Sequence, residues 1–235
     1  NLVMTFSDIT EERQIRQLHE AGVTDITIAV GYLKEKFEYL IDKYGVRLLY
    51  NPEYASKNTL ATVFHARKLF AGRNMYLLPS DIWLRQNPYH RYECGAWYSG
   101  VYMDGPTSEW CLSYNKKNRI TSVTIGGADS WVMYGPAYFS RAFSDAFLPL
   151  LEAAYRRPGT EPDHWEQVVL EEIDRLELYM NFQPANQVYE FENLEELRQF
   201  DPHYQNHSDN EAMQLIARVF RIAESESQNI RCLKS

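Results

Sequence analysis

Between Thr24 and Leu78, short apolar runs alternate with longer amphipathic segments, and this alternation constrains the fold more than any other feature of the sequence. Short runs of β-branched and apolar residues are typical of buried strands, whereas apolar residues that recur every three to four positions are typical of helices. The predicted strands span 24–30, 46–50 and 74–78, and the predicted helices span 33–44 and 59–70. Alternation of this kind predicts an α/β fold with a parallel, doubly wound sheet and right-handed crossovers.

The sequence changes character after Cys94. Short alternating runs between 94 and 138 are separated by turn signals at 104–106, 115–118 and 126–127, which predicts an antiparallel or mixed extension of the sheet. Ser7 or Asp8 can cap an opening helix that Gly22 closes. The other predicted elements are helices over 140–155, 164–176, 193–200 and 209–223, and short strands over 178–182 and 187–191.

Composition and motifs exclude several classes of protein. The net charge is −8 with scattered Lys and Arg, which argues against a nucleic-acid-binding protein. There is no run of about 18 apolar residues, so we expect no membrane span. The widely spaced Cys94, Cys111 and Cys232 favour reduced thiols in a cytoplasmic protein over a disulfide framework or a zinc site. The absence of HExxH, GxSxG and P-loop motifs argues against the corresponding hydrolases and P-loop enzymes.

Acidic side chains at two strand ends are the first candidates for chemistry. Asp81 follows the predicted strand 74–78, where a carboxylate could hold Mg²⁺ bound to nucleotide phosphates or could merely cap the next turn. Alternation places Glu190 and Glu192 on one face of the predicted strand 187–191. A pair of this kind can bind a metal ion or can simply be solvated.

A carboxylate lies next to an aromatic residue at Glu109 and Trp110, and Tyr134 and Trp165 belong to the same aromatic-rich part of the chain. A carboxylate beside aromatic faces is suited to a quaternary ammonium ligand through cation–π attraction. Aromatic residues in strands more often pack within a core or on a sheet, so both interpretations stay open.

Several of these segments together resemble a known family. The run from Glu12 to Thr59, the strand ending at Asp81, and the segments TSEWCLSY, GPAYF, DHWEQ and VYEFENLEEL are similar to the bacterial CTP:phosphocholine cytidylyltransferases of the nucleotidyltransferase superfamily. The similarity extends from about Leu2 to Phe200. It implies a Rossmann-like nucleotidyltransferase fold, with a mixed, mostly parallel sheet, helices on both faces and a smaller β extension.

The resemblance also implies a role for particular residues. Asp81 matches the first Mg²⁺-binding aspartate of the family, and Glu192 stands where the family usually has a second, shorter aspartate. Both are therefore expected to be catalytic as metal ligands. Asn58, with Thr59, matches a position close to the nucleotide. Glu109, Trp110 and Trp165 match positions near phosphocholine, and Tyr134, from the same aromatic-rich part of the chain, is expected there as well.

The implied activity is Mg²⁺-dependent transfer of CMP from CTP to phosphocholine, which yields CDP-choline and pyrophosphate. The family opens with a strand and a glycine-rich phosphate loop, and the printed sequence starts where that segment should end. We therefore expect residues 1–200 to form a nucleotidyltransferase domain without this loop, and residues 201–235 to form a helix and linker toward a kinase-like domain. The alternatives are a sugar-phosphate nucleotidyltransferase and a non-catalytic binding domain.

Overall fold

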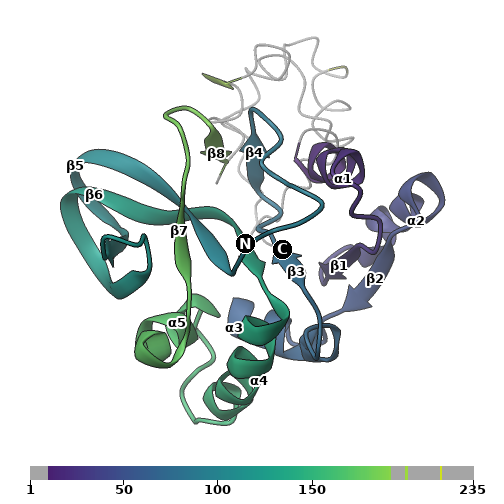
Figure 1. The fold of residues 1–235 in the computed structure, drawn as a ribbon. Coiled ribbons are helices and arrows are strands. Elements are labelled where there is room, and N and C mark those ends of the chain that lie inside the picture. Colours follow the sequence, from purple (N-terminus) through teal and green to yellow (C-terminus); the bar gives the residue numbers. More distant parts are fainter. Residues whose placement is uncertain (1–9, 192–198, 201–217, 219–235) are drawn as a thin grey trace. The chain divides into compact units, whose positions relative to one another are not determined.

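The computed structural model of the chain describes residues 10–191, 199–200 and 218. The chain divides into two compact units, one formed by residues 7–189 and the other by residues 1–6 with 190–235. In the second unit, the rings of Phe191 and Phe200 lie 5.0 Å apart. The helices predicted over 193–200 and 209–223 fall almost wholly outside the described residues. The elements with defined bounds lie almost entirely in the first unit (Figure 1).

The structure contains the alternating elements that the sequence predicts between 24 and 78. The helices, with short 3-10 helices written η, are α1 (Glu11–Glu20), η1 (Lys34–Phe37), α2 (Tyr39–Tyr44), α3 (Thr59–His65), η2 (Arg67–Leu69), α4 (Arg141–Tyr155), α5 (Glu166–Glu172) and η3 (Ile173–Arg175). The strands are β1 (Thr27–Val30), β2 (Arg47–Tyr50), β3 (Met75–Leu77), β4 (Ile82–Leu84), β5 (Trp97–Tyr114), β6 (Ile120–Phe139), β7 (Tyr179–Phe182) and β8 (Val188–Glu190).

The pairing of the strands is mixed. β1 and β2 are parallel, from Thr27 opposite Arg47 to Val30 opposite Tyr50. A four-stranded sheet has the order β3-β6-β5-β7, in which β5 and β7 are parallel, and β4 pairs with β8. These pairings confirm the α/β class with a mixed sheet. The third predicted strand differs in one respect, because β3 pairs with β6 in the antiparallel direction. An apolar run specifies that a strand is buried and leaves its partner to the tertiary structure.

β5 and β6 form one long curved hairpin (Figure 1). The sequence predicts four short strands here, but only the turn at 115–118 joins the two strands. The other two turn signals coincide with irregular pairing, since the register shifts between Met103 and Pro106 and between Thr107 and Trp110. Gly105 and Gly126 have φ angles of 76° and 77°, a conformation that glycine adopts without strain. These signals therefore mark β-bulges that bend the hairpin.

Three hydrophobic clusters hold the first unit together. The main core joins α3, α4 and α5 to the β3-β6-β5-β7 sheet, with Phe70, Phe139, Phe147, Ile120, Leu151 and Leu178 almost fully buried. A second cluster includes Leu18, Ile82, Leu84, Tyr89 and Val188. A third consists of Ile15, Leu40 and Val46 with their partly buried neighbours. The apolar faces predicted for these helices therefore point into the core.

Two sequence expectations can be compared directly with this unit. Cys94 is exposed and Cys111 is buried, and both are free thiols, while Cys232 lies outside the described residues. Among the described residues, no helix combines the length and the hydropathy that a membrane span requires.

Candidate active site

The carboxyl ends of β1 and β2 and the loop that follows them form the first part of the site. Ligands of open α/β sheets bind at this end of the strands. The buried Asn51 donates its backbone N–H to the carbonyl of Val30 (2.8 Å), and its side-chain nitrogen donates to Oγ1 of Thr62 (3.0 Å). Its side-chain oxygen accepts a hydrogen bond from the backbone N–H of Glu53 (2.9 Å). The loop from Pro52 to Asn58 therefore starts at a point fixed to both β1 and α3.

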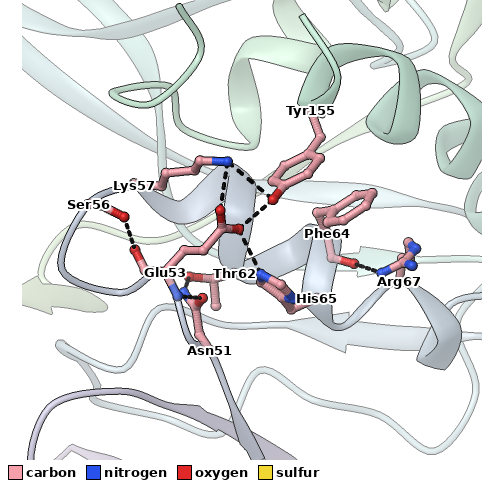
Figure 2. Close-up of polar contacts among 9 residues, drawn as sticks. All are labelled: Asn51, Glu53, Ser56, Lys57, Thr62, Phe64, His65, Arg67 and Tyr155. Carbon is pink, nitrogen blue, oxygen red and sulfur yellow. Dashed lines mark hydrogen bonds and ion pairs between the residues drawn. The ribbon is translucent and has the colours of Figure 1, made fainter. Parts of the chain in front are cut away.

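A cluster of polar side chains around Glu53 fixes the middle of this loop (Figure 2). The Glu53 carboxylate lies 2.7 Å from Nζ of Lys57 and 2.8 Å from Nε2 of His65, and it also accepts a hydrogen bond from the hydroxyl of Tyr155. The Tyr155 ring stacks on Phe64 at 3.6 Å. Because His65 ends α3 and Tyr155 ends α4, the cluster joins the loop to both helices.

The electrostatics of this cluster indicate an anchor and argue against a proton-transfer group. Hydrogen bonds from Lys57 and Tyr155 lower the pKa of Glu53 to about 2. The bond to Glu53 in turn raises the pKa of Lys57. A general base is most effective when its pKa lies near the working pH, and Glu53 is ionised far below neutrality. The cluster therefore holds the loop as a permanent ion pair.

Asn58 ends this loop and begins α3. Its side-chain oxygen accepts a hydrogen bond from the backbone N–H of Thr59 (2.7 Å), so its nitrogen must face the other partners. That nitrogen lies 3.1 Å from the carbonyl oxygen of Pro162 and 3.1 Å from Nε2 of His164. Because an amide nitrogen only donates, Nε2 of His164 is the acceptor in this contact. The loop from 161 to 165 is thereby attached to the start of α3.

Backbone groups at the start of α3 are occupied by the same loop. The N–H groups of Asn58 and Leu60 donate to the carbonyls of Glu161 (2.8 Å) and Asp163 (3.2 Å). Oγ1 of Thr59 accepts from the N–H of Trp165 (3.2 Å). Asn58 and Thr59, predicted to bind the nucleotide, thus have protein partners for several of their polar groups, and contact with the nucleotide stays a prediction.

Trp110 and Glu109 lie on β5 next to this loop. The Trp110 and His164 rings meet edge to face, with centroids 6.4 Å apart. Glu109 lies within the register shift that precedes Trp110, and its backbone N–H donates to Oγ1 of Thr107 (3.1 Å). Both residues are half-exposed. The structure therefore connects Trp110 to Asn58 through His164, with Glu109 as the residue that precedes Trp110 on β5.

The other two aromatic candidates lie in hydrophobic clusters. Trp165 is only 7% exposed, and its ring stacks on Tyr98 (5.8 Å) and contacts Phe139 and Phe147. Tyr134 packs against the second cluster, whereas Trp110 packs against the main core. The structure therefore does not place Tyr134 in the same cluster as the two tryptophans.

The structure describes only one of the two predicted metal ligands. Asp81 is exposed on the turn between β3 and β4, whereas Glu192 lies outside the described residues. In the described part of the chain, no group of three or more His, Cys, Asp or Glu side chains is arranged to hold a metal ion. An exposed carboxylate fits Mg²⁺, because this ion needs only one or two protein carboxylates and completes its shell with phosphate oxygens and water.

The Glu53 cluster has no counterpart among the sequence predictions. The four-residue spacing of Glu53 and Lys57 could have suggested the ion pair, since such a pair is common on one helical face. Tyr155 lies about 100 positions further along the chain, and no local pattern indicates that contact.

Comparison with known proteins gives three informative similarities. The chain is 28% identical to the choline-phosphate cytidylyltransferase of Streptococcus pneumoniae over 190 residues, which is 81% of this chain and 82% of that protein. It is 30% identical to the 2-aminoethylphosphonate cytidylyltransferase of Lancefieldella rimae over 195 residues, or 82% of this chain and 79% of that protein. No family model matches the chain.

A solved structure shows the same fold. The CTP:phosphocholine cytidylyltransferase LicC from Streptococcus pneumoniae superimposes with a TM-score of 0.77 at 28% identity, covering 82% of this chain and 83% of that one. The similarity spans most of both chains.

Proposed function

This chain belongs to the cytidylyltransferases of the nucleotidyltransferase superfamily, and on that premise we propose that it transfers CMP from CTP to phosphocholine. The observation that carries the proposal is the position of Trp110, which Glu109 precedes on β5. The Trp110 ring adjoins His164, which contacts Asn58 at the start of α3. Residues assigned to the acceptor and to the nucleotide therefore occupy one region of the fold.

The reaction requires positioning and charge stabilisation more than covalent catalysis. A phosphate oxygen of phosphocholine attacks the α-phosphorus of CTP, a new P–O bond forms, and the bond to the β-phosphate oxygen breaks to release pyrophosphate. Asp81 would hold Mg²⁺, with Glu192 as the second carboxylate that the family resemblance implies. When bound, the ion neutralises negative charge on the phosphates. Asn58, Thr59 and the anchored loop would orient the nucleotide for in-line attack.

Glu109 and Trp110 are the residues that we assign to the cationic end of the acceptor. A carboxylate attracts the positive charge, and an indole face binds a trimethylammonium group without hydrogen bonds. We omit Trp165 and Tyr134 from this pocket, because the Trp165 ring is covered by core side chains and Tyr134 packs in the second cluster. A second acceptor, 2-aminoethylphosphonate, is the substrate named for the relative with 30% identity. Its primary ammonium would use the carboxylate more than the ring.

The test compares acceptors on the full chain. We expect product formation from CTP, Mg²⁺ and phosphocholine, with kcat/KM above that for phosphoethanolamine, 2-aminoethylphosphonate and glucose 1-phosphate. Asp81→Asn should abolish turnover because the amide keeps the shape but loses the charge, whereas Asp104→Asn, at an exposed aspartate of the hairpin, should not. Faster turnover of 2-aminoethylphosphonate would reassign the acceptor, and an active Asp81→Asn variant would refute the metal assignment.

Trp110→Ala provides the second arm of this test. A cation–π contact contributes about 0.5–2 kcal/mol, so KM for phosphocholine should rise roughly 2- to 30-fold while KM for CTP changes little. Equal increases for both substrates would show that the ring only packs against its neighbours.

A further inference from the structure

Helix α1 is attached to β4 and the turn before it by side chains that donate to backbone carbonyls. Arg13 donates through Nε to Leu84 (2.8 Å) and through a terminal nitrogen to Arg85 (2.7 Å). Gln17 donates to Leu84 as well (3.2 Å). Gln14, which follows Arg13 in the same helix, makes a different contact. Its hydrogen-bond partners are Pro79 and Ile82, at the two ends of the turn that carries Asp81.

The Gln14 amide joins the two ends of that turn. Its Nε2 donates to the carbonyl of Pro79 (2.9 Å) and to the carbonyl of Ile82 (2.9 Å), and the residue is only 5% exposed. One nitrogen with two hydrogens thus satisfies two carbonyls that flank Ser80 and Asp81. A buried carbonyl that loses its donor costs about 1–3 kcal/mol, so the turn would have to rearrange if this amide were removed.

We propose that Gln14 is a positioning residue for cytidylyl transfer, which holds the 79–82 turn so that Asp81 can bind the Mg²⁺–nucleotide complex. The inference rests on the role of Asp81 in the proposed function. Gln14 does not touch the substrate and acts only through the backbone of the turn. Displacement of a reacting group by about 1 Å can reduce the rate about 100-fold, so a change at this buried amide can affect turnover strongly.

Gln14→Met and Gln17→Met form a matched pair for the test. Both replace a buried glutamine of α1 with an unbranched side chain of similar length that cannot donate, but only Gln14 contacts the turn. We expect Gln14→Met to lower kcat about 10- to 100-fold and to raise the Mg²⁺ concentration needed for half-maximal rate. Gln17→Met should stay within about 3-fold of wild type, because Gln17 donates to the Leu84 carbonyl in β4 rather than to the turn, and that carbonyl keeps Nε of Arg13 as a donor.

Two readouts are independent of turnover. Hydrogen–deuterium exchange of the peptide spanning 79–84, measured without metal or nucleotide, should accelerate in Gln14→Met and stay near wild type in Gln17→Met. Calorimetry should show weaker binding of Mg²⁺–CTP to Gln14→Met. If Gln14→Met is unfolded at the assay temperature, Gln14→Asn retains the donor on a side chain one methylene shorter and should show the same pattern.

The outcomes separate this inference from the proposed function. An inactive Asp81→Asn together with normal kcat, exchange and Mg²⁺–CTP binding in Gln14→Met would overturn the positioning role and leave the function intact. Equal losses of kcat in both glutamine variants, in proportion to the decrease in their melting temperatures, would show that Gln14 contributes only to stability. An active Asp81→Asn variant would overturn the metal assignment and with it the positioning role of Gln14, whereas the comparison of acceptors tests the proposed function separately.

Discussion

At the scale of single residues, Glu53 shows how one carboxylate can fix a loop. It accepts hydrogen bonds from Lys57, His65 and Tyr155, and these donors come from the loop itself and from the ends of α3 and α4. The side chain is about one-quarter exposed, so solvent weakens each contact. The contribution of Glu53 to the stability of the loop therefore comes from the number of donors that share its carboxylate.

The lowered pKa of Glu53 predicts a specific pH dependence of stability. Its pKa falls from the ordinary 4.5 to about 2 in the folded chain, chiefly through the hydrogen bond from Lys57. Stability from this carboxylate is therefore complete above about pH 5 and is lost as the pH falls toward 2. Glu53→Gln should cost about 1 kcal/mol of unfolding free energy at pH 7, and the difference from wild type should shrink below pH 5. Urea unfolding at a series of pH values measures this difference in unfolding free energy, and Glu35→Gln, at an exposed glutamate, is the control. A difference that is independent of pH would argue against the ion pair.

At the scale of elements, the site depends on a close approach between the end of β1 and the loop after β2. A Cβ atom at Gly31 would lie 2.5 Å from Cβ of Tyr54, nearer than side chains approach each other in folded proteins. Because the obstructing atom is next to the Tyr54 backbone, a ring rotation does not relieve the contact. The absence of a side chain at residue 31 is therefore what allows the loop to pack against β1.

Gly31→Ala should displace this loop. We expect a loss of about 1–3 kcal/mol in unfolding free energy, as for overpacked cores, and a rise in KM for CTP. Gly95→Ala is the control, because a Cβ there would lie 4.0 Å from the ring of Tyr179. Thermal melts and steady-state kinetics of both variants provide the comparison. Wild-type behaviour of Gly31→Ala would show that the loop adjusts without cost.

At the scale of the whole molecule, nucleotide binding should couple to folding. The proposed nucleotide and metal residues of the first unit lie on separate segments, the loop before α3 and the turn after β3, so a ligand that contacts both is lost on unfolding. CTP with Mg²⁺ at about 100 times its Kd should add about 2.7 kcal/mol to stability. For a chain of this size, that corresponds to roughly 5–10 °C in Tm. GTP at the same concentration should shift Tm less. Equal shifts with both nucleotides would indicate binding through phosphates alone, without recognition of the base.

Some of this architecture is determined by local sequence. The apolar periods of 33–44 and 59–70 predict helical segments, and the β-branched run at 24–30 predicts a strand, because side-chain period follows directly from backbone geometry. The structure has helical turns in both ranges, divided into η1 and α2 and into α3 and η2, and it has β1 within 24–30. Asn58 is recognisable as a helix cap from its residue type and its position before an apolar run. Asp81 is recognisable as a strand-end carboxylate for the same local reason.

Other features were decided only by tertiary structure, since they depend on contacts between distant residues. One such feature is the antiparallel pairing of β3 with β6, and another is the replacement of turns by bulges in the β5–β6 hairpin. A third is the burial of Trp165 against Tyr98, Phe139 and Phe147. The contacts of Glu53 with Tyr155 and of Gln14 with Pro79 join residues 102 and 65 positions apart. A single sequence specifies which side chains are apolar, charged or able to donate, whereas the partner that each of them meets is chosen when the whole chain packs.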